Sequence, residues 1–219
     1  MLPEMNHKEV DIEAVAEKAS ADKELLSEIL DGLTLKDETL RYNCHRVLMH
    51  ISERNGELLY HKWDYFVELL GSDNSYRKMS AVQIIANLTK VDTENRFEKI
   101  VDKYYGLLDD KSMIVAIYVA ASSAEIVRAK PQLEREITNR LLDIDKTHHP
   151  EERKLLIKAG AIEAFNKYFR EAADKERIIA FIREEQNCVS PALEIGPDIS
   201  GLSGSRKRMR RLAQMEVVA

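Results

Sequence analysis

Apolar residues recur at intervals of three and four along almost the whole chain, from residue 9 to residue 187. This spacing places them on one face of a helix. No segment alternates apolar and polar residues as a half-buried strand would. Short polar clusters interrupt the pattern at residues 32–37, 55–56, 71–75, 109–112, 130–131 and 147–150. The sequence therefore predicts an all-α protein of eight to ten helices and no sheet.

The interruptions are themselves regularly spaced. Asp37, Asp73 and Asp110 each precede an expected helix, and they are 36 and 37 residues apart. An aspartate there accepts hydrogen bonds from the free N–H groups of the first helical turn. Arg41 and Arg77 follow the first two aspartates by four residues. A period between about 30 and 47 residues, built from helix pairs, is typical of an α-solenoid.

These turns carry a family resemblance. The Asp-to-Arg spacing resembles the signature between the two helices of a HEAT repeat. Residues 158–165 (Lys-Ala-Gly-Ala-Ile-Glu-Ala-Phe) resemble the opening of an armadillo repeat, and residues 86–88 (Ala-Asn-Leu) resemble an armadillo helix end. The resemblance covers residues 22–185, with Ile114 in place of the arginine in the third unit. It implies a right-handed α-α superhelix, an ARM/HEAT-type solenoid of about four to five helical repeats.

Composition changes near residue 188. Residues 1–188 are expected to form the ARM/HEAT-like repeat domain, and residues 189–219 form a Pro/Gly/Ser linker and a basic C-terminal tail. Such a tail can bind nucleic acid, anionic lipid or an import receptor, or dock on the acidic body of the same or another copy. Self-association thus stays open. The basic cluster consists of Arg206, Lys207, Arg208, Arg210 and Arg211.

The formal charge is divided unevenly along the 219 residues. The whole chain carries −5, and residues 191–219 contain five basic against three acidic residues. Residues 1–190 therefore carry −7, which opposes the binding of a phosphate backbone to the body at long range. Nucleic acid is expected as a partner through the tail only.

Three features favour a cytoplasmic protein. Two cysteines, Cys44 and Cys188, are too few for a disulfide framework. No apolar run reaches the about 18 residues that cross a bilayer, so no membrane span is expected. The first ten residues lack the apolar core of a signal peptide.

The second helices of stacked repeats line a shared concave face. Arg46, His50 and Arg54 have i, i+4 spacing and form a basic stripe there, unless they are an ordinary solvated face. We expect this face to bind a protein partner that offers an acidic or helical segment. The expected partner-binding residues are Arg41, His45, Arg46, His50, Lys78, Gln83, Asn87, Tyr118, Ser122 and Glu125.

Residues 112–124 contain no charged side chain and are apolar all round. This composition predicts a central helix buried between neighbouring repeats. The alternative is that Tyr118 and Ser122, on its outer side, form the floor of an apolar groove for a partner helix.

Four aromatic residues are closely spaced at Tyr60, Trp63, Tyr65 and Phe66. A core cluster is the favoured interpretation, and an interface hot spot is the alternative. Trp63 is expected to keep some exposure because of its size.

The chain contains none of the common catalytic motifs, namely HExxH, GxSxG, GxGxxG or a P-loop. The adjacent His148 and His149 lack a third partner in sequence, so capping and solvation explain them better than a metal site does. We therefore expect no catalytic residue, no cofactor and no metal. The favoured function is a non-catalytic scaffold or adaptor. The alternatives are a nucleic-acid-associated protein or, through Trp63 and Asp64, a HEAT-like DNA alkylpurine glycosylase.

Overall fold

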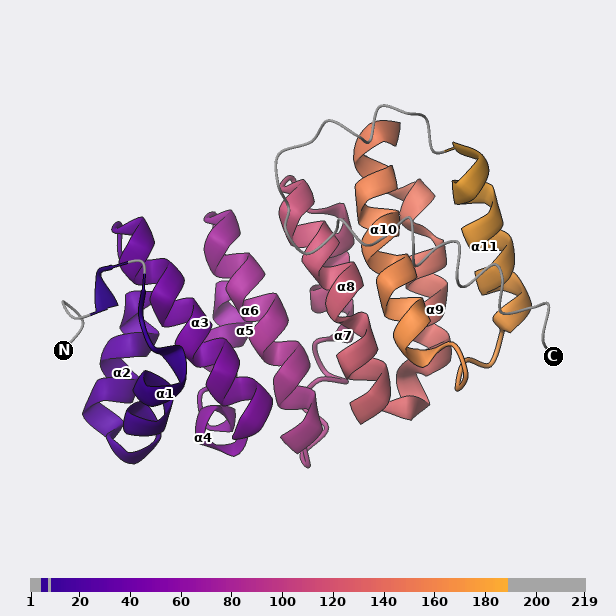
Figure 1. Cartoon of the computed structure of the whole chain (residues 1–219). Coiled ribbons are helices and arrows are strands. Elements are labelled where there is room, and N and C mark those ends of the chain that lie inside the picture. Colours follow the sequence, from indigo (N-terminus) through magenta and orange to yellow (C-terminus); the bar gives the residue numbers. More distant parts are fainter. Residues whose placement is uncertain (1–4, 8, 189–219) are drawn as a thin grey trace. The chain divides into compact units, whose positions relative to one another are not determined.

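The computed structural model describes residues 5–7 and 9–188 of the chain. Within this part the protein is all α-helical and contains no strand, as the sequence predicts (Figure 1). The structure has eleven α-helices, slightly more than expected. They are α1 (Ile12–Ala21), α2 (Lys23–Gly32), α3 (Glu38–Arg54), α4 (Glu57–Tyr60), α5 (Trp63–Leu69), α6 (Ser75–Leu88), α7 (Val101–Tyr105), α8 (Met113–Ala129), α9 (Glu134–Leu142), α10 (Glu151–Tyr168) and α11 (Lys175–Cys188).

The extra helices arise from breaks that apolar periodicity does not reveal. After α6, a short 3-10 turn (η2, Thr89–Val91) leads into a non-helical loop. Asp92 closes this loop by accepting hydrogen bonds from the backbone N–H groups of Arg96 (2.9 Å) and Phe97 (3.0 Å). Asn95 has a left-handed backbone with φ of 52°, which ends any helix there. The helical pattern, which the sequence predicts to continue between the polar clusters at residues 71–75 and 109–112, is therefore interrupted here.

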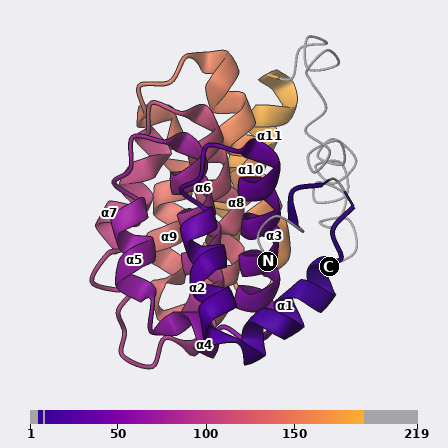
Figure 2. The ribbon, with the colours of Figure 1, turned by 90° about the vertical axis from the view of Figure 1, so that its left-hand side faces the viewer.

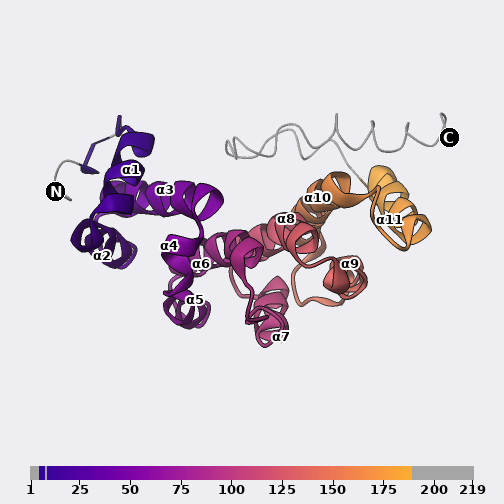
Figure 3. The ribbon, with the colours of Figure 1, turned by 90° about the horizontal axis from the view of Figure 1, so that it is seen from below.

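The helices group into two compact units, with a boundary inside α7 between Tyr104 and Tyr105. In the first unit, α1 packs on α2 and α3, and α1 runs obliquely to α2 (Figure 2). Helices α3 and α6 pack against each other, and α5 packs on α6 (Figure 3). Adjacent helix pairs within this unit therefore share one core.

The α2–α3 turn is the point where the first unit joins its helix pairs. Asp37 is the N-cap of α3 and accepts a hydrogen bond from Leu40 N at 2.9 Å, as predicted. Arg41 Nη1 donates to Leu35 O at 3.0 Å, and Arg77 Nη2 donates to Thr34 O at 2.8 Å. Both arginines of the Asp-to-Arg spacing thus hold the same turn.

The cap predicted at Asp73 is wrong by one residue. Asn74 is the N-cap of α6, and its side chain accepts from Tyr76 N and Arg77 N. At the third predicted cap, Ser112 occupies the N-cap position of α8, while Asp110 Oδ1 accepts from Ser112 N at 2.8 Å. Asn, Ser and Asp serve equally well as caps, so spacing alone does not decide between neighbours.

Aromatic residues fill the core of the first unit. Trp63 is only 2% exposed, so the expectation that its size would leave it partly open is wrong. Its ring meets Tyr60 edge-on at 5.8 Å between centroids. Phe66 is also buried, and Tyr60 and Tyr65 are half-buried, so the core interpretation holds for two of the four aromatic residues. Cys44 is fully buried and packs so close to Gly32 that a Cβ there would lie 2.3 Å from Cys44 Sγ.

In the second unit, α8 packs along α10, and α9 contacts both helices (Figure 3). The uncharged stretch forms most of α8 and is buried along Val115, Ala116, Val119 and Ala120, as predicted. A Cβ at Gly160 of α10 would lie 2.9 Å from the carbonyl oxygen of Ile117. Glycine is thus required for the close approach of these two helices.

None of the described helices combines the length and the apolar character needed to cross a membrane. The expected linker and tail at residues 189–219, including the basic cluster, lie outside the described residues.

Candidate partner-binding surface

The exposed face of α3 carries three side chains at intervals of four residues: Tyr42, Arg46 and His50, here called the α3 strip. Tyr42 is 53% exposed, the most exposed large hydrophobic residue of the described chain. The Arg46 guanidinium carbon lies 5.7 Å from the centroid of the Tyr42 ring. This cation–π contact places the guanidinium of the half-buried Arg46 beside the exposed aromatic ring.

Neither Arg46 nor His50 forms a hydrogen bond or an ion pair with any described residue. Glu53 follows Arg46 by seven residues on the same helix and makes no ion pair with it. The third member of the predicted stripe behaves differently, since Arg54 pairs with Glu13 of α1 at 3.4 Å. The unneutralised positive charge of this face is therefore centred on Arg46.

The two other predicted residues of α3 lie inside the unit. The Arg41 guanidinium holds the α2–α3 turn and lies 4.8 Å from the centroid of the Tyr76 ring. His45 is 8% exposed and meets the Tyr76 ring edge-on at 5.8 Å between centroids. Burial lowers the pKa of His45 from its usual 6.5 to about 4, so its imidazole is neutral at pH 7. These two residues support the surface from beneath.

The three partner-binding residues predicted on α6 also include both buried and more accessible side chains. Lys78 and Asn87 are both buried, and Asn87 Nδ2 donates to Ser52 Oγ of α3 at 2.9 Å. Asn87 thus joins the two second helices. Gln83 is half-buried, and its Nε2 donates to Met79 O at 3.4 Å. Gln83 is the one residue of the three that keeps side-chain surface for a partner.

Tyr118, Ser122 and Glu125 belong to α8 in the second unit, where all three are half-buried. Glu125 forms ion pairs with Arg128 at 3.6 Å and with Lys167 at 3.4 Å. Its charge is therefore neutralised within the unit. These residues are not part of the α3 strip.

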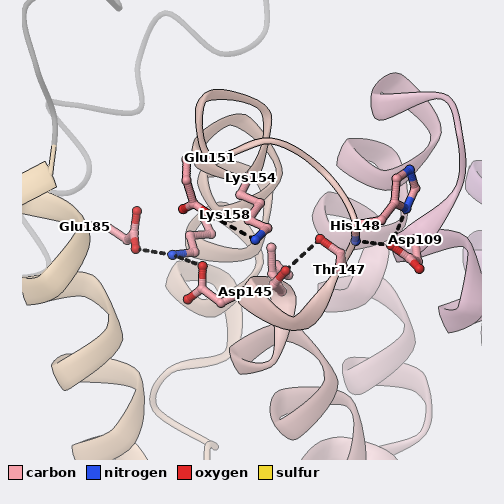
Figure 4. Close-up of polar contacts among 9 residues, drawn as sticks. Asp109, Asp145, Thr147, His148, Glu151, Lys154, Lys158 and Glu185 are labelled. Carbon is pink, nitrogen blue, oxygen red and sulfur yellow. Dashed lines mark hydrogen bonds and ion pairs between the residues drawn. The ribbon is translucent and has the colours of Figure 1, made fainter.

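A group of three side chains that could hold a metal ion, which the sequence does not reveal, lies elsewhere in the second unit. One ligand atom each of Asp109, His148 and His149 falls within 4.8 Å of the others. Asp109 ends the 3-10 helix η3 (Gly106–Asp109), and the two histidines precede α10. Figure 4 shows the side chain of Asp109 facing that of His148.

Comparison with known proteins gives no further assignment. No family model matches the chain, and searches of curated proteins and of solved structures find no match. The functional argument therefore rests on the residues themselves.

Tyr42 is a candidate binding residue that the sequence analysis did not name. An aromatic residue in a helical pattern is normally assigned to the core, so its exposure is not expected from the sequence. The available signal was its position four residues before Arg46, on the polar side of the helix.

Proposed function

We propose that this protein is a non-catalytic scaffold that holds an acidic segment of a partner protein against the α3 strip. In this proposal the helix pairs stack into a right-handed ARM/HEAT-type superhelix, and the second helices provide the binding face. The packing of α3 on α6 and of α8 on α10 is what stacked pairs require. The observation that carries the proposal is the contact between the exposed Tyr42 and the half-buried Arg46, which has no acidic partner among the described residues.

The chemistry of this pair suits protein recognition. Tyrosine and arginine are the residue types that most often dominate binding energy at protein interfaces. A guanidinium can grip a carboxylate with two hydrogen bonds, while the tyrosine ring supplies apolar area with little loss of rotamer freedom. Because the Tyr42 ring and the Arg46 guanidinium already contact each other, binding a partner costs less side-chain entropy.

The surroundings favour an acidic rather than a basic occupant. Residues 1–190 carry a net charge of −7. Even so, neither Arg46 nor His50 forms an ion pair with a described acidic residue. At physiological salt the screening length is about 8 Å, so the nearby guanidinium outweighs distant acidic residues for a group in contact with the strip.

The test is a selection of displayed random peptides on the full-length protein, followed by affinity measurements on the enriched peptides. We expect enrichment of acidic residues beside an apolar or aromatic anchor. Tyr42→Ala and Arg46→Glu should each weaken binding by about tenfold or more. The matched control is Arg135→Glu, since Arg135 is an exposed arginine of α9 without an ion pair. Equal binding by Arg46→Glu and by the unchanged protein would overturn the proposal.

The two alternative functions, a DNA glycosylase and a nucleic-acid-associated protein, depend on other residues. A glycosylase built on Trp63 and Asp64 receives no support, because Trp63 lies in the core and Asp64 pairs with Arg96. A nucleic-acid-associated protein would instead depend on the five basic residues of the tail. Replacing those five residues with glutamine should then abolish salt-sensitive binding to DNA or RNA and leave peptide binding unchanged.

A further inference from the structure

The group formed by Asp109, His148 and His149 joins segments that are 39 residues apart in sequence. Asp109 Oδ1 accepts a hydrogen bond from His148 N at 2.7 Å and lies 2.6 Å from His148 Nδ1 (Figure 4). The backbone hydrogen bond is the main reason that the pKa of Asp109 lies below its usual value. Asp109 Oδ2 has no hydrogen bond with a described residue and stays available as a ligand.

His149 supplies the second, independent observation. It is only 3% exposed, and its Nε2 atom is buried without a hydrogen-bond partner. A buried polar atom in this state costs about 1–3 kcal/mol, so its retention calls for a ligand. The ring is held from two sides, by the stacked His148 ring at 4.4 Å between centroids and by the backbone of Leu108. Such support is typical of metal-binding histidines, which are oriented by a backbone or carboxylate partner.

The loop that carries both histidines is anchored along its length. It begins with the 3-10 helix η5 (Ile144–Lys146), in which Ile144 is fully buried. Lys158 Nζ of α10 binds Asp145 of this turn at 2.6 Å and Glu185 of α11 at 2.6 Å (Figure 4). Thr147 Oγ1 donates to Ile144 O at 2.8 Å, and Pro150 is the N-cap of α10. The donors therefore sit on a preorganised frame rather than on a free loop.

We propose that Asp109, His148 and His149 bind a divalent transition-metal ion, with Zn²⁺ as the ion that this donor set suits best. Two imidazole nitrogens and one carboxylate oxygen make a three-ligand N₂O set, which leaves a fourth tetrahedral position for water or for a donor from a partner. Ligand bonds of about 2.0–2.1 Å place tetrahedral donors about 3.3 Å apart, so the three donor atoms, now within 4.8 Å of one another, must rearrange around the ion.

The first experiment is a titration of the chelator-treated, full-length protein with Zn²⁺, followed by calorimetry. We expect one ion per chain. Asp109→Asn removes the ligand charge but keeps an oxygen to accept the His148 backbone bond, and His148→Gln removes one imidazole. Each should weaken Zn²⁺ binding at least tenfold. The control is His61→Gln, which removes an exposed histidine of the first unit and should change nothing.

Cobalt provides a second readout that does not depend on affinity. Co²⁺ in the same site should give the visible absorption of a tetrahedral ion with N and O ligands, without the charge-transfer band of a thiolate. Loss of this spectrum in His148→Gln would support the site. Three results would overturn the proposal: no Zn²⁺ bound at one ion per chain, binding that both variants retain, or a thiolate band that indicates cysteine ligation.

Discussion

Helix α3 packs against α6 in the first unit, and α8 packs against α10 in the second. The two helix pairs differ in how their charged side chains are paired. Along α8–α10 the helices approach so closely that glycine is required at position 160, and the buried charge of Lys158 is fully paired. Along α3–α6 a neutral His45 is buried instead, Tyr42 is exposed, and the half-buried Arg46 has no acidic partner among the described residues. The α8–α10 pair thus has its buried charge paired, whereas the α3–α6 pair leaves one arginine without an acidic partner, which is where we propose that a partner binds.

This contrast shows where unsatisfied groups are tolerated. A buried charge without a partner is expensive, and the second unit avoids that penalty by surrounding the Lys158 ammonium with two carboxylates. A surface arginine without a partner costs little, because water solvates it. Unpaired groups on α3 are therefore compatible with stability and informative about binding.

The largest expected effect comes from breaking the buried ion pair of the second unit. Burial alone would lower the pKa of Lys158, but the hydrogen bonds from Asp145 and Glu185 outweigh it and raise that pKa. Lys158→Met leaves the buried Glu185 carboxylate without its partner and should destabilise the unit by about 3–5 kcal/mol. Urea unfolding followed by far-UV circular dichroism measures this.

The matched control for that change is the double variant Lys158→Met/Glu185→Leu. Burial raises the pKa of Glu185, which shows that its charge depends on the lysine. Removing both members should restore most of the lost stability. If the double variant is as unstable as the single one, the ion pair does not explain the effect.

His45 makes the first unit sensitive to acid. Because burial lowers its folded-state pKa to about 4, the folded form favours neutral imidazole, and the stabilisation is complete above the unfolded pKa of about 6.5. It is lost as the pH falls from 6.5 toward 4, by about 3 kcal/mol at pH 4. Trp63 is the single tryptophan and lies in the first unit, so its fluorescence follows this unfolding.

His45→Gln is the comparison that isolates this effect, since glutamine does not titrate in this range. The difference in unfolding free energy between the variant and the unchanged protein should shrink as the pH falls. A difference that stays constant between pH 7 and pH 4 would show that His45 does not control the acid response.

A smaller effect is expected where α8 meets α10. Gly160→Ala places a Cβ 2.9 Å from the Ile117 carbonyl oxygen and should destabilise the second unit by about 1–2 kcal/mol after the gain in helix propensity. Gly106→Ala is the control, because no atom lies within 4 Å of the added Cβ. It should be neutral or slightly stabilising. Equal losses in both variants, measured by urea unfolding, would argue against close packing at Gly160.

Much of the helical framework could be predicted from apolar spacing, because each helix buries one face. The local breaks were harder: Asp92 and Asn95 end the helical pattern through hydrogen bonding and a left-handed backbone, not through a change in polarity. The shift of the cap from Asp73 to Asn74 has the same origin, because either residue can serve.

The candidate sites were less accessible to sequence reasoning. Burial of His45, Lys78 and Asn87 depends on how α6 packs on α3, which helical spacing alone does not specify. The meeting of Asp109 with His148 depends on the path of the chain through α8 and α9. Neither arrangement leaves a local motif, so only tertiary structure reveals it.

The most direct test of the scaffold proposal compares three proteins in binding to one enriched acidic peptide: the unchanged chain, Arg46→Glu and Arg135→Glu. Both variants change the net charge equally, so a nonspecific electrostatic effect would weaken them alike. We expect Arg46→Glu to lose about tenfold or more in affinity and Arg135→Glu to bind as the unchanged chain does. Equal affinities for all three, or equal losses in both variants, would contradict a partner site on α3.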